Sequence, residues 1–454
     1  MKRPSDPRSL ALQALEALER RDAFADAVLD GLFRRHPGIT QRDRALVSHL
    51  VYGVLRWRNR LDAHVALASA RAPARMHPRL LQILRLGAYQ VLFLDRIPDR
   101  AAVSESVELA RSAGQGHAAG FVNAVLRKVA TRETSLDFPS DPVGRLALEL
   151  GCPPWLVGRW AEELGLDGAE VLCRGASRVP ALWLRVDPAR CSREAILSRL
   201  QDAGLPAQPG AFAPEAVWLP PSGDPRALPA VAEGLAVVQD QASQLVAHLV
   251  APGPGWRILD ACAAPGLKTT QLASLAQPGA RVTALDVHAH RARQIEDLSR
   301  RLQSAGVTVV VADARTYRAE EPYDAVLVDA PCSGLGVLSR NPEAKWRRTP
   351  ESLPELPPLQ LSLLENLSDA VRPGGVLVYA TCTTLRAENE EVVNAFLTRR
   401  RDFRPERPPE GQVPWERLLS PEGHLRTYPE LQAGEGAEAL DGFFAARLRR
   451  SDRP

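Results

Sequence analysis

The sequence predicts a multidomain protein in which an all-helical amino-terminal domain precedes a small α/β subdomain and a larger carboxyl-terminal α/β domain. Three observations support this fold class. The chain of 454 residues is too long for one ordinary core. Apolar residues recur at helical spacing up to about residue 132. From residue 257 onward, five short apolar runs alternate with helical segments.

The all-helical domain is expected over residues 1–135. Amphipathic stripes predict its helices, and prolines such as Pro37, Pro73 and Pro98 separate them. The stripes comprise Leu10, Leu12, Leu15 and Leu18, then Val47, Leu50, Val51, Val54 and Leu55, then Leu80, Leu81, Leu84, Leu86, Val91 and Leu92, and finally Val103, Val107, Phe121, Val122, Val125 and Leu126.

Two shorter regions follow the helical domain. Residues 136–180 are rich in proline at their start and are expected to form a helical connector. Residues 181–235 are expected to form the small α/β subdomain, because strand-like runs at 182–186 and 216–219 flank an amphipathic helix at 192–203.

Residues 236–454 are expected to form the larger domain, with a doubly wound, Rossmann-like sheet of parallel strands. Its strands are predicted at 257–260, 280–286, 307–313, 325–329 and 375–379. Its helices are predicted at 269–275, 290–304, 359–371 and 389–400.

Composition argues against several classes of protein. Apolar residues make up 45 % of the chain and charged residues 24 %, and no window approaches the roughly 18 unbroken apolar residues of a membrane span. The first residues lack the apolar stretch of a secretory signal, so a cytoplasmic location is expected. The six cysteines lack paired close spacing, which argues against disulfides and against a bound metal.

Positive charge is concentrated in the amino-terminal third. The formal net charge is only +3, yet residues 1–150 carry about seven more basic than acidic side chains. This distribution suits a phosphate-rich partner, and it equally suits a solvated helical surface. Charge alone leaves both interpretations open.

Four of the five predicted strands end in an aspartate: Asp260, Asp286, Asp313 and Asp329. A single aspartate at a strand end is usually a turn former or a helix cap. Four at corresponding strand ends line one crevice, where a nucleoside cofactor needs acceptors for its ribose hydroxyls and adenine amino group.

The loop at 260–269 joins the first strand to its helix and reads Asp-Ala-Cys-Ala-Ala-Pro-Gly-Leu-Lys-Thr. Small residues let the backbone approach a ligand, and exposed amides at a helix start attract a carboxylate. The loop is neither a phosphate-binding Gly-Lys-Ser/Thr pattern nor a three-glycine dinucleotide turn. A cofactor with an amino-acid carboxylate and no phosphate fits best, and S-adenosylmethionine is such a cofactor.

Two cysteines follow neighbouring predicted strands. Cys332 lies in Asp-Ala-Pro-Cys after the run at 325–328, and Cys382 lies in Thr-Cys-Thr after the run at 376–379. Both thiols are therefore expected on the carboxyl edge of one sheet, as a nucleophile and a helper.

These motifs, in this order, resemble those of the RNA cytosine-C5 methyltransferases of the Nol1/Nop2/Sun type. The resemblance rests on residues 260–269, 329–336 and 379–383, followed by Glu388-Asn389-Glu390. The helical domain resembles the NusB RNA-binding fold, and the combination implies methylation of bacterial 16S ribosomal RNA. Leu267 stands where the family usually has glycine, and Thr383 where it usually has serine.

The resemblance implies roles for the catalytic residues. In this family the Thr-Cys thiol attacks C6 of cytosine and the Pro-Cys thiol assists release, so Cys382 is the expected nucleophile and Cys332 the helper. Analogy with DNA cytosine methyltransferases would reverse the two. Asp329 is expected to hydrogen-bond N3 or the amino group of the base, and Lys268 to orient Asp329 or the substrate.

The cofactor residues expected at this site are Cys262, Ala263, Ala264, Pro265, Gly266, Leu267, Lys268, Asp286, Asp313 and Asp329. Among them, Asp286 is expected to hold the ribose hydroxyls and Asp313 the adenine. Asp260 is expected to support the loop rather than to contact the cofactor.

The segment Arg340–Arg348 mixes basic residues with Trp346, and we expect it to contact RNA phosphates and stack a base. The alternative is a solvated loop with Trp346 in the core. The expected partner is 16S rRNA, with no membrane, no metal and a monomeric chain. Alternatives are the same chemistry on tRNA or another rRNA position, a non-catalytic RNA-binding factor, and a small-molecule methyltransferase.

Overall fold

A computed structural model describes residues 6–20, 23–131, 136–221, 223–429 and 440–452. The chain forms two compact units. One comprises Met1–Arg178 together with Leu338–Arg347, and the other comprises Val179–Val337 together with Arg348–Pro454.

The first unit is helical, as predicted, and its core is built from the predicted apolar stripes. Thr40 caps the longest helix by accepting a hydrogen bond from the N–H of Asp43, and Pro78 begins the next α-helix at the position where a missing N–H costs nothing. The α-helices are α1 (Pro7–Arg20), α2 (Ala25–Arg35), α3 (Gln41–Ser69), α4 (Pro78–Phe93), α5 (Asp99–Ser112), α6 (Ala119–Thr131), α7 (Pro142–Glu149) and α8 (Pro154–Ser177).

A distant segment of the chain completes this unit. Residues 338–347, which include α14 (Ala344–Arg347), belong to the helical unit although in sequence they lie between two strands of the second unit. The Lys345 ammonium is 0 % exposed and donates to the carbonyls of Arg56 and Gly151, each at 2.8 Å. The Trp346 indole N–H donates to the carbonyl of Leu55 at 2.5 Å.

The prediction that this segment contacts RNA is therefore wrong for Lys345, whose ammonium is buried, and it stays a prediction for Trp346, which is only partly buried. Both side chains are amphipathic, so each buries its apolar body against the helical core while its polar end finds a backbone carbonyl. Sequence patterning could not show that these carbonyls, almost 300 residues away for Leu55, are within reach.

The second unit contains two sheets. The small sheet has the order β2-β3-β1-β4, with every pair antiparallel. The boundary predicted between the small subdomain and the larger domain, at 235/236, falls directly before β4, so the last strand of the small sheet lies on the far side of the predicted boundary. Its strands are β1 (Leu182–Val186), β2 (Gln208–Pro209), β3 (Ala216–Leu219) and β4 (Ala236–Val238), and its helices are α9 (Arg193–Asp202) and α10 (Pro229–Ala232).

The large sheet has the order β10-β12-β9-β8-β5-β6-β7, and β11 pairs with β12. All five predicted strands are present and parallel, and β12 is antiparallel to both of its neighbours. The sheet is therefore mixed, whereas the sequence predicted only its parallel part. The strands are β5 (Arg257–Ala261), β6 (Arg281–Asp286), β7 (Val307–Val311), β8 (Tyr323–Asp329), β9 (Val371–Thr381), β10 (Phe403–Pro405), β11 (Leu425–Arg426) and β12 (Phe444–Arg450).

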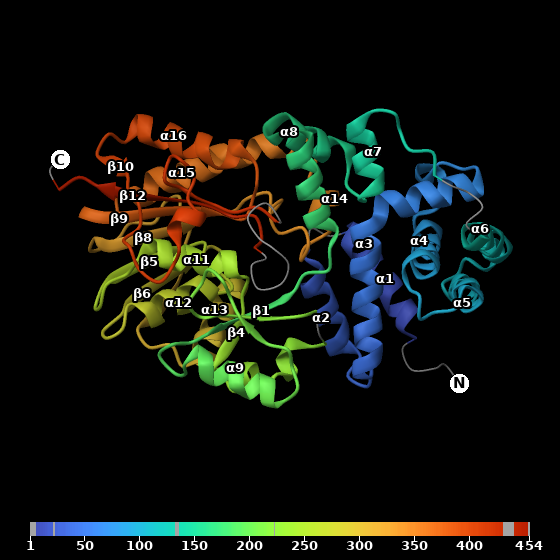
Figure 1. Ribbon diagram of the computed structural model, residues 1–454, viewed down its shortest axis with the longest axis horizontal. Coiled ribbons are helices and arrows are strands. Elements are labelled where there is room, and N and C mark those ends of the chain that lie inside the picture. The colour runs from blue at the N-terminus through green and yellow to red at the C-terminus, as the bar shows by residue number, and fades with distance from the viewer. Residues whose placement is uncertain (1–5, 21–22, 132–135, 222, 430–439, 453–454) are drawn as a thin grey trace. The chain divides into compact units, whose positions relative to one another are not determined.

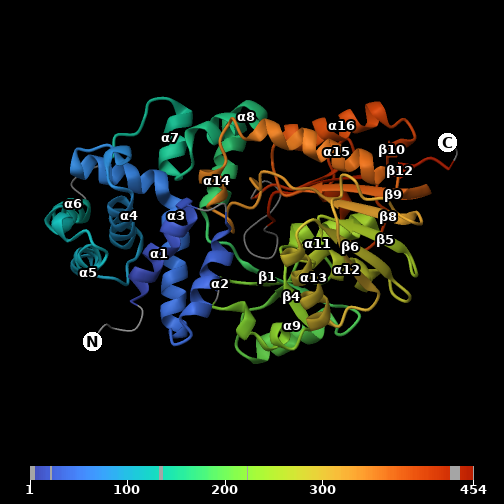
Figure 2. The ribbon, with the colours of Figure 1, turned by 180° about the vertical axis from the view of Figure 1, so that it is seen from behind.

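Helices cover both faces of this sheet, as expected for a doubly wound fold (Figures 1 and 2). On one face lie α11 (Gln241–Val250), α12 (Leu267–Leu275) and α13 (Ala289–Leu302), and on the other lie α15 (Leu356–Ser368) and α16 (Glu390–Arg399). Val371 was predicted to end a helix but begins β9 instead.

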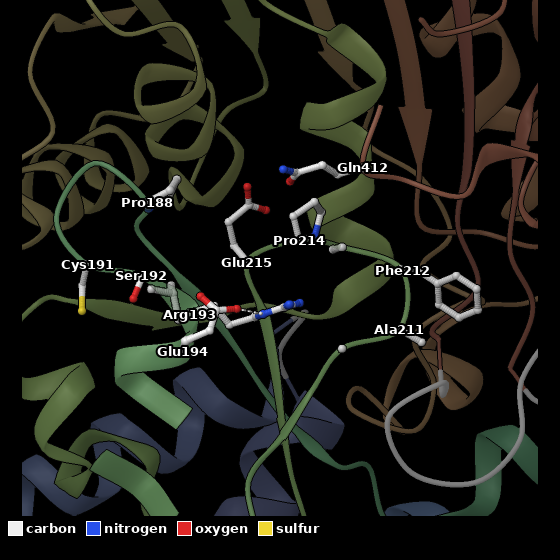
Figure 3. Close-up of a pocket in the computed structure, with 13 residues that line it drawn as sticks. Pro188, Cys191, Ser192, Arg193, Glu194, Ala211, Phe212, Pro214, Glu215 and Gln412 are labelled. Atoms are coloured by element: carbon white, nitrogen blue, oxygen red, sulfur yellow. Dashed lines mark hydrogen bonds and ion pairs between the residues drawn. The ribbon is translucent and has the colours of Figure 1, made fainter. Parts of the chain in front are cut away.

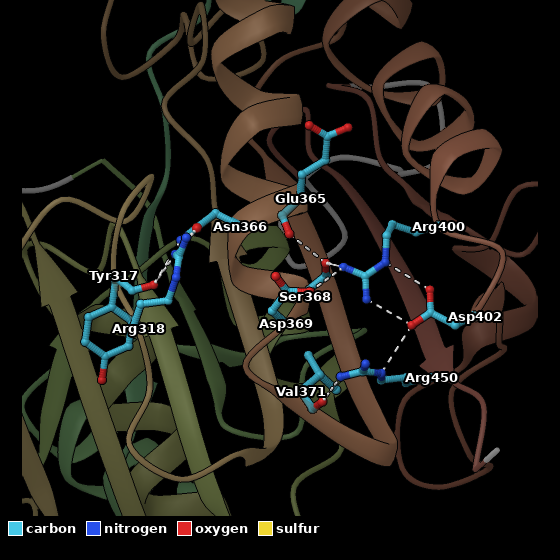
Figure 4. A network of polar contacts seen from close by, with 10 residues as sticks. All are labelled: Tyr317, Arg318, Glu365, Asn366, Ser368, Asp369, Val371, Arg400, Asp402 and Arg450. Atoms are coloured by element: carbon cyan, nitrogen blue, oxygen red, sulfur yellow. Dashed lines mark hydrogen bonds and ion pairs between the residues drawn. The ribbon is translucent and has the colours of Figure 1, made fainter. Parts of the chain in front are cut away.

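A polar network ties the amino-terminal end of β9 to its surroundings (Figure 4). Arg400 binds Asp402 in a bidentate manner, with both nitrogen-oxygen distances at 2.9 Å, and also donates to Asp369 at 2.8 Å. Arg450 reaches the carbonyl of Val371 and the Asp402 carboxylate. These contacts fix β9 at the sheet edge opposite the cysteines, so the network is structural.

In the ranges that the structure describes, none of the helices combines the length and the apolar character needed to cross a membrane. The same ranges contain no cluster of three or more His, Cys, Asp or Glu residues suited to a metal ion.

Candidate active site

The two cysteines meet at the carboxyl edge of the large sheet. Strands β8 and β9 are parallel neighbours with Asp329 opposite Ala380, so the loops that follow them emerge side by side. The Sγ atoms of Cys332 and Cys382 are 3.4 Å apart. One small reacting centre could therefore contact both thiols.

Backbone contacts hold the two loops together. The N–H of Gly336, in the loop after Cys332, donates to the carbonyl of Cys382 at 2.9 Å. A side chain at Gly336 would collide with the Gly442 carbonyl, because a Cβ atom there would lie 1.9 Å from that oxygen. Glycine is thus required for this close approach.

The Cys332 thiol keeps its proton. Its hydrogen bond with Cys382 raises the pKa of Cys332 well above the ordinary value, and burial and the nearby Glu388 carboxylate raise it further. Cys332 therefore carries an S–H group, and its sulfur lies 3.4 Å from the sulfur of Cys382.

Asp329 and Lys268 form an ion pair beside the thiols. The Lys268 Nζ lies 2.8 Å from the Asp329 Oδ2 and 5.5 Å from the centre of the Phe443 ring. Burial lowers the pKa of Lys268, but the adjacent Asp329 carboxylate, together with smaller effects of Cys382 and Asp260, raises it, so the net shift is upward. Lys268 therefore remains charged and fixes the orientation of the Asp329 carboxylate.

Asp260 lies beneath this pair rather than in the crevice. It is 0 % exposed, and its Oδ2 accepts the Thr269 hydroxyl at 2.6 Å. Burial raises its pKa to about 7, although the hydrogen bond from Thr269 acts in the opposite direction. This position agrees with the predicted role of Asp260 as a support for the loop.

The loop before α12 turns sharply. Cys262 has a φ of 59° and Gly266 a φ of 100°, and a Cβ atom at Gly266 would press on Ile295 at 3.0 Å. Asp286 accepts the N–H of Ala264 at 3.4 Å, which links the end of β6 to this loop. Burial raises the pKa of Cys262 to about 12, so its thiol stays neutral.

Asp286 and Asp313 have different surroundings. Asp286 is buried, and its Oδ1 accepts the N–H of His288 at 3.0 Å. Asp313 lies two residues beyond β7, partly exposed and paired with Arg315 at 2.6 Å. A ligand that reaches the Asp313 carboxylate would compete with this exposed arginine.

Two exposed apolar side chains accompany these aspartates. Val287 follows Asp286 and Val311 ends β7, and each is 53 % exposed. Exposed valines at adjacent strand ends offer an apolar surface to a flat base, while the aspartates offer acceptors to its sugar and amino group. These residue types fit S-adenosylmethionine. The prediction from sequence missed both valines, although Val287, an apolar residue directly after a strand-end acid, was a visible signal.

Arg348 was assigned to RNA contact, but it also supports the Cys332 loop. Its guanidinium donates to the carbonyls of Cys332 and Ser333, each at 3.1 Å. The other eight residues of the predicted RNA-binding segment belong to the helical unit.

A large cavity lies away from these residues. It has a volume of about 730 Å³ and is lined by parts of the small subdomain and by Gln412 (Figure 3). Of its two glutamates, Glu194 and Glu215, the second is paired with His248 at 2.7 Å. None of the predicted site residues lines this cavity.

Comparison with protein families gives three matches along the chain. Residues 5–131 match the NusB family. Residues 152–224 match the ferredoxin-like domain of the RsmF/B-like methyltransferases. Residues 247–449 match the family described as 16S rRNA methyltransferase RsmB/F.

Curated proteins resemble the chain over nearly its full length. A probable ribosomal RNA small subunit methyltransferase B of Bacillus subtilis is 36 % identical over 451 residues, which cover 98 % of each protein. A ribosomal RNA small subunit methyltransferase B of Salmonella arizonae is 35 % identical over 454 residues, which cover 99 % of each.

Solved structures share the fold. The crystal structure of PH0851 covers 99 % of this chain and 100 % of its own, with a TM-score of 0.82 and 25 % identity. The structure of NSun6 from Pyrococcus horikoshii with SFG covers 66 % of this chain and 98 % of its own, with a TM-score of 0.58 and 22 % identity.

Proposed function

Because the chain belongs to the RsmB/F family of 16S rRNA methyltransferases, we propose that it methylates C5 of a cytosine in 16S rRNA, the one numbered 967. The family establishes that the chain is an S-adenosylmethionine-dependent rRNA methyltransferase. The atom, the nucleotide and the roles of the residues are the proposal.

One observation carries the proposal: the pair of thiols 3.4 Å apart beside the Asp329–Lys268 ion pair. Methyl transfer to a nitrogen or to a ribose hydroxyl needs no thiol, because those atoms are nucleophilic already. C5 of cytosine is a poor nucleophile until a group adds at C6. A second thiol is useful only when that addition must be reversed.

In the first step Cys382 adds to C6 as a thiolate. The C6–S bond forms, and the electrons of the C5–C6 double bond make C5 nucleophilic. Asp329, held by Lys268, hydrogen-bonds N3 or the amino group of the base and stabilises the charge that develops there. When bound, S-adenosylmethionine supplies an electrophilic methyl group at this point.

Release reverses the addition. C5 loses its proton to a water molecule, the C5–C6 double bond forms again, and the C6–S bond breaks with its electron pair returning to the Cys382 sulfur. The Cys332 S–H donates a hydrogen bond to that sulfur as the negative charge returns, and Cys332 keeps its proton. The raised pKa of Cys332 and the 3.4 Å separation of the sulfur atoms support this role.

The cofactor is proposed to lie against the loop at 262–268 and the strand ends at Asp286 and Asp313. Its carboxylate would meet the start of α12, its ribose Asp286, and its adenine Asp313 with Val287 and Val311. Asp286 is only 2 % exposed, so of these proposed contacts the one between Asp286 and the ribose has the least exposed side chain.

The helical unit is proposed to dock the RNA. A cavity of about 590 Å³ in this unit is lined by Trp346, Gln82 and several arginines, including Arg58 and Arg85. Arginines beside an aromatic residue suit phosphates and a splayed base. The target cytosine must itself leave its stack, because C6 is inaccessible within stacked RNA. The proposed site of action is the cytoplasm, with the chain acting as a monomer.

Trapping on RNA tests the chemistry. RNA that carries 5-fluorocytosine at the target should become covalently attached to the protein in the presence of S-adenosylmethionine, because fluorine cannot leave as a proton does. Methylation without any covalent adduct would contradict the proposal. Bisulfite sequencing of RNA from a strain that lacks the protein identifies the nucleotide, and a lost mark in tRNA or elsewhere in rRNA would move the target.

A further inference from the structure

A buried carboxylate lies beneath the two loops that carry the cysteines. Glu388 is 1 % exposed, and its Oε2 accepts the N–H of Ser333 at 2.8 Å while its Oε1 accepts the Thr383 hydroxyl at 3.2 Å. Ser333 directly follows Cys332, and Thr383 directly follows Cys382. Each cysteine loop therefore gives one donor to the same carboxylate.

Helix α15 adds a further donor to this carboxylate. The side-chain amide of Gln360 donates to the Glu388 Oε2 and to the carbonyl of Pro331, both at 3.0 Å. The hydroxyls of Ser333 and Thr383 also contact each other at 2.7 Å. The result is a continuous polar network that joins one helix to both loops.

The Cys332 loop is thus held from two directions. Glu388 accepts the N–H of Ser333, and Arg348 donates to the carbonyls of Cys332 and Ser333. Hydrogen bonds to a charged group are stronger than neutral ones, and a buried donor left without its acceptor is costly. Glu388 therefore constrains where the Cys332 sulfur can lie.

We propose that Glu388 is a positioning residue for product release. Its carboxylate holds the Cys332 loop against the Cys382 loop, so that the Cys332 S–H faces the Cys382 sulfur when the C6–S bond breaks. This inference rests on the proposed two-cysteine reaction. It assigns Glu388 no contact with RNA or cofactor, because Glu388 acts only through the loops.

The first measurement needs neither RNA nor cofactor. Dibromobimane links two thiols that lie close together, and peptide mapping identifies the Cys332–Cys382 link. We expect Glu388→Ala to slow this link about tenfold, whereas Glu388→Gln, which keeps one acceptor oxygen, stays within about threefold of the parent protein. A parent-like rate in Glu388→Ala would overturn the proposal.

The second measurement separates attack from release. On 5-fluorocytosine RNA, Glu388→Ala should be trapped at close to the parent rate, because attack by Cys382 does not need Cys332 and the Cys382 carbonyl still accepts the N–H of Gly336. On ordinary RNA in a single turnover, the same variant should accumulate the covalent adduct and release product about tenfold more slowly. An equal loss of trapping and of turnover would show a purely structural role and overturn the proposal.

A milder pair of variants covers the case in which Glu388→Ala does not fold. Gln360→Leu removes the donor from α15 and keeps the volume, and it should show the same accumulation of adduct to a smaller degree. Ser362→Ala, on the same helix but bonded only to the Leu359 carbonyl, should release product at the parent rate. Equal release by these two variants would overturn the proposal.

The proposed reaction and the proposed role of Glu388 can be contradicted by different results. If Cys382→Ala still becomes attached to 5-fluorocytosine RNA, the proposed reaction is wrong. If Cys382→Ala abolishes attachment while the Glu388 and Gln360 variants release product normally, only the role of Glu388 is wrong.

Discussion

Arg185 of the small sheet donates a hydrogen bond to the carbonyl of Leu267, at the start of α12 in the proposed cofactor loop. The same guanidinium donates to the Gln239 side chain at 2.6 Å and to the Thr270 hydroxyl at 2.9 Å. Burial lowers the pKa of Arg185 to about 10, so it remains charged near neutral pH. The small subdomain thus contacts the carboxyl end of the proposed cofactor loop through Arg185.

Arg185→Met should weaken cofactor binding. The change removes the Arg185 donor from the Gln239 side chain and from the Leu267 carbonyl, which still accepts the Thr270 hydroxyl, at a cost of about 2–4 kcal/mol. We expect a lower melting temperature and a dissociation constant for S-adenosylmethionine raised about tenfold, measured by calorimetry. Arg193→Met, on the same subdomain, is the control, and equal affinities in the two variants would contradict the role of Arg185.

Substitution of the two cysteines should have opposite consequences. Cys382→Ala should abolish both methylation and attachment to 5-fluorocytosine RNA, because no thiolate adds at C6. Cys332→Ala should accumulate a covalent protein–RNA adduct on ordinary RNA, because the departing sulfur has lost its S–H donor. Denaturing gels resolve the adduct, and reversed outcomes would exchange the two roles.

Lys268→Met should slow the attack by about 100-fold, because Asp329 loses the partner that orients it. Lys268→Arg should recover part of the rate, since it restores a positive charge. The upward shift of the Lys268 pKa means that the ion pair persists below pH 10, so the rate should show no decline from Lys268 between pH 7 and 9. Single-turnover trapping over this range measures both effects.

Asp260 should make the protein less stable as pH rises from about 4 to 7. Its pKa is raised in the folded state to about 7, so the folded protein keeps a proton that the unfolded chain has already released. The stability it contributes is present at low pH and is lost by the time the pH exceeds the folded pKa. The free energy of unfolding should fall by at most about 1.4 kcal/mol per pH unit on account of this group.

Asp260→Asn tests this sign. The variant should come closest to the parent protein in urea unfolding near pH 4 and exceed its stability near pH 8, because the amide never has to ionise. Glu343, whose pKa burial also raises to about 7, titrates in the same range in both proteins. The difference between parent and variant therefore isolates Asp260, and parallel curves would contradict the assignment.

Arg58→Ala should weaken RNA binding and reduce its dependence on salt. Arg58 lines the cavity of the helical unit and lies 5.4 Å from the Trp346 ring, so its loss removes a charge and a contact to that ring. S-adenosylmethionine affinity should not change. Arg111→Ala, paired with Glu108 on α5, is the control, and equal RNA affinities in the two variants would place the docking surface elsewhere.

Local patterns in the sequence were sufficient for the parallel part of the fold. Strand-end aspartates and loops of small residues can be recognised from residues adjacent in sequence. Asp260 and the two cysteine loops could therefore be placed at the carboxyl edge of the sheet. Strand β12 could not be predicted from sequence, because Arg447 and Arg449 interrupt its apolar pattern. Both arginines are stabilised by Glu406, some 40 residues away in the chain. The network around Glu388 was also missed, since its donors come from three separate segments.

Because residues 338–347 belong to the helical unit, this unit is built from two separate segments of the chain. Removal of residues 1–132 would take the Leu55 carbonyl from Trp346 and the Arg56 carbonyl from Lys345, and would leave Lys345 with the carbonyl of Gly151. It would therefore disturb residues 338–347 of the remaining chain rather than remove an independent appendage. The polypeptide passes between the two units three times, at 178/179, 337/338 and 347/348. A protease that cuts once after Arg178 therefore leaves both halves covalently fastened, and two further cuts are needed before the helical unit can come away.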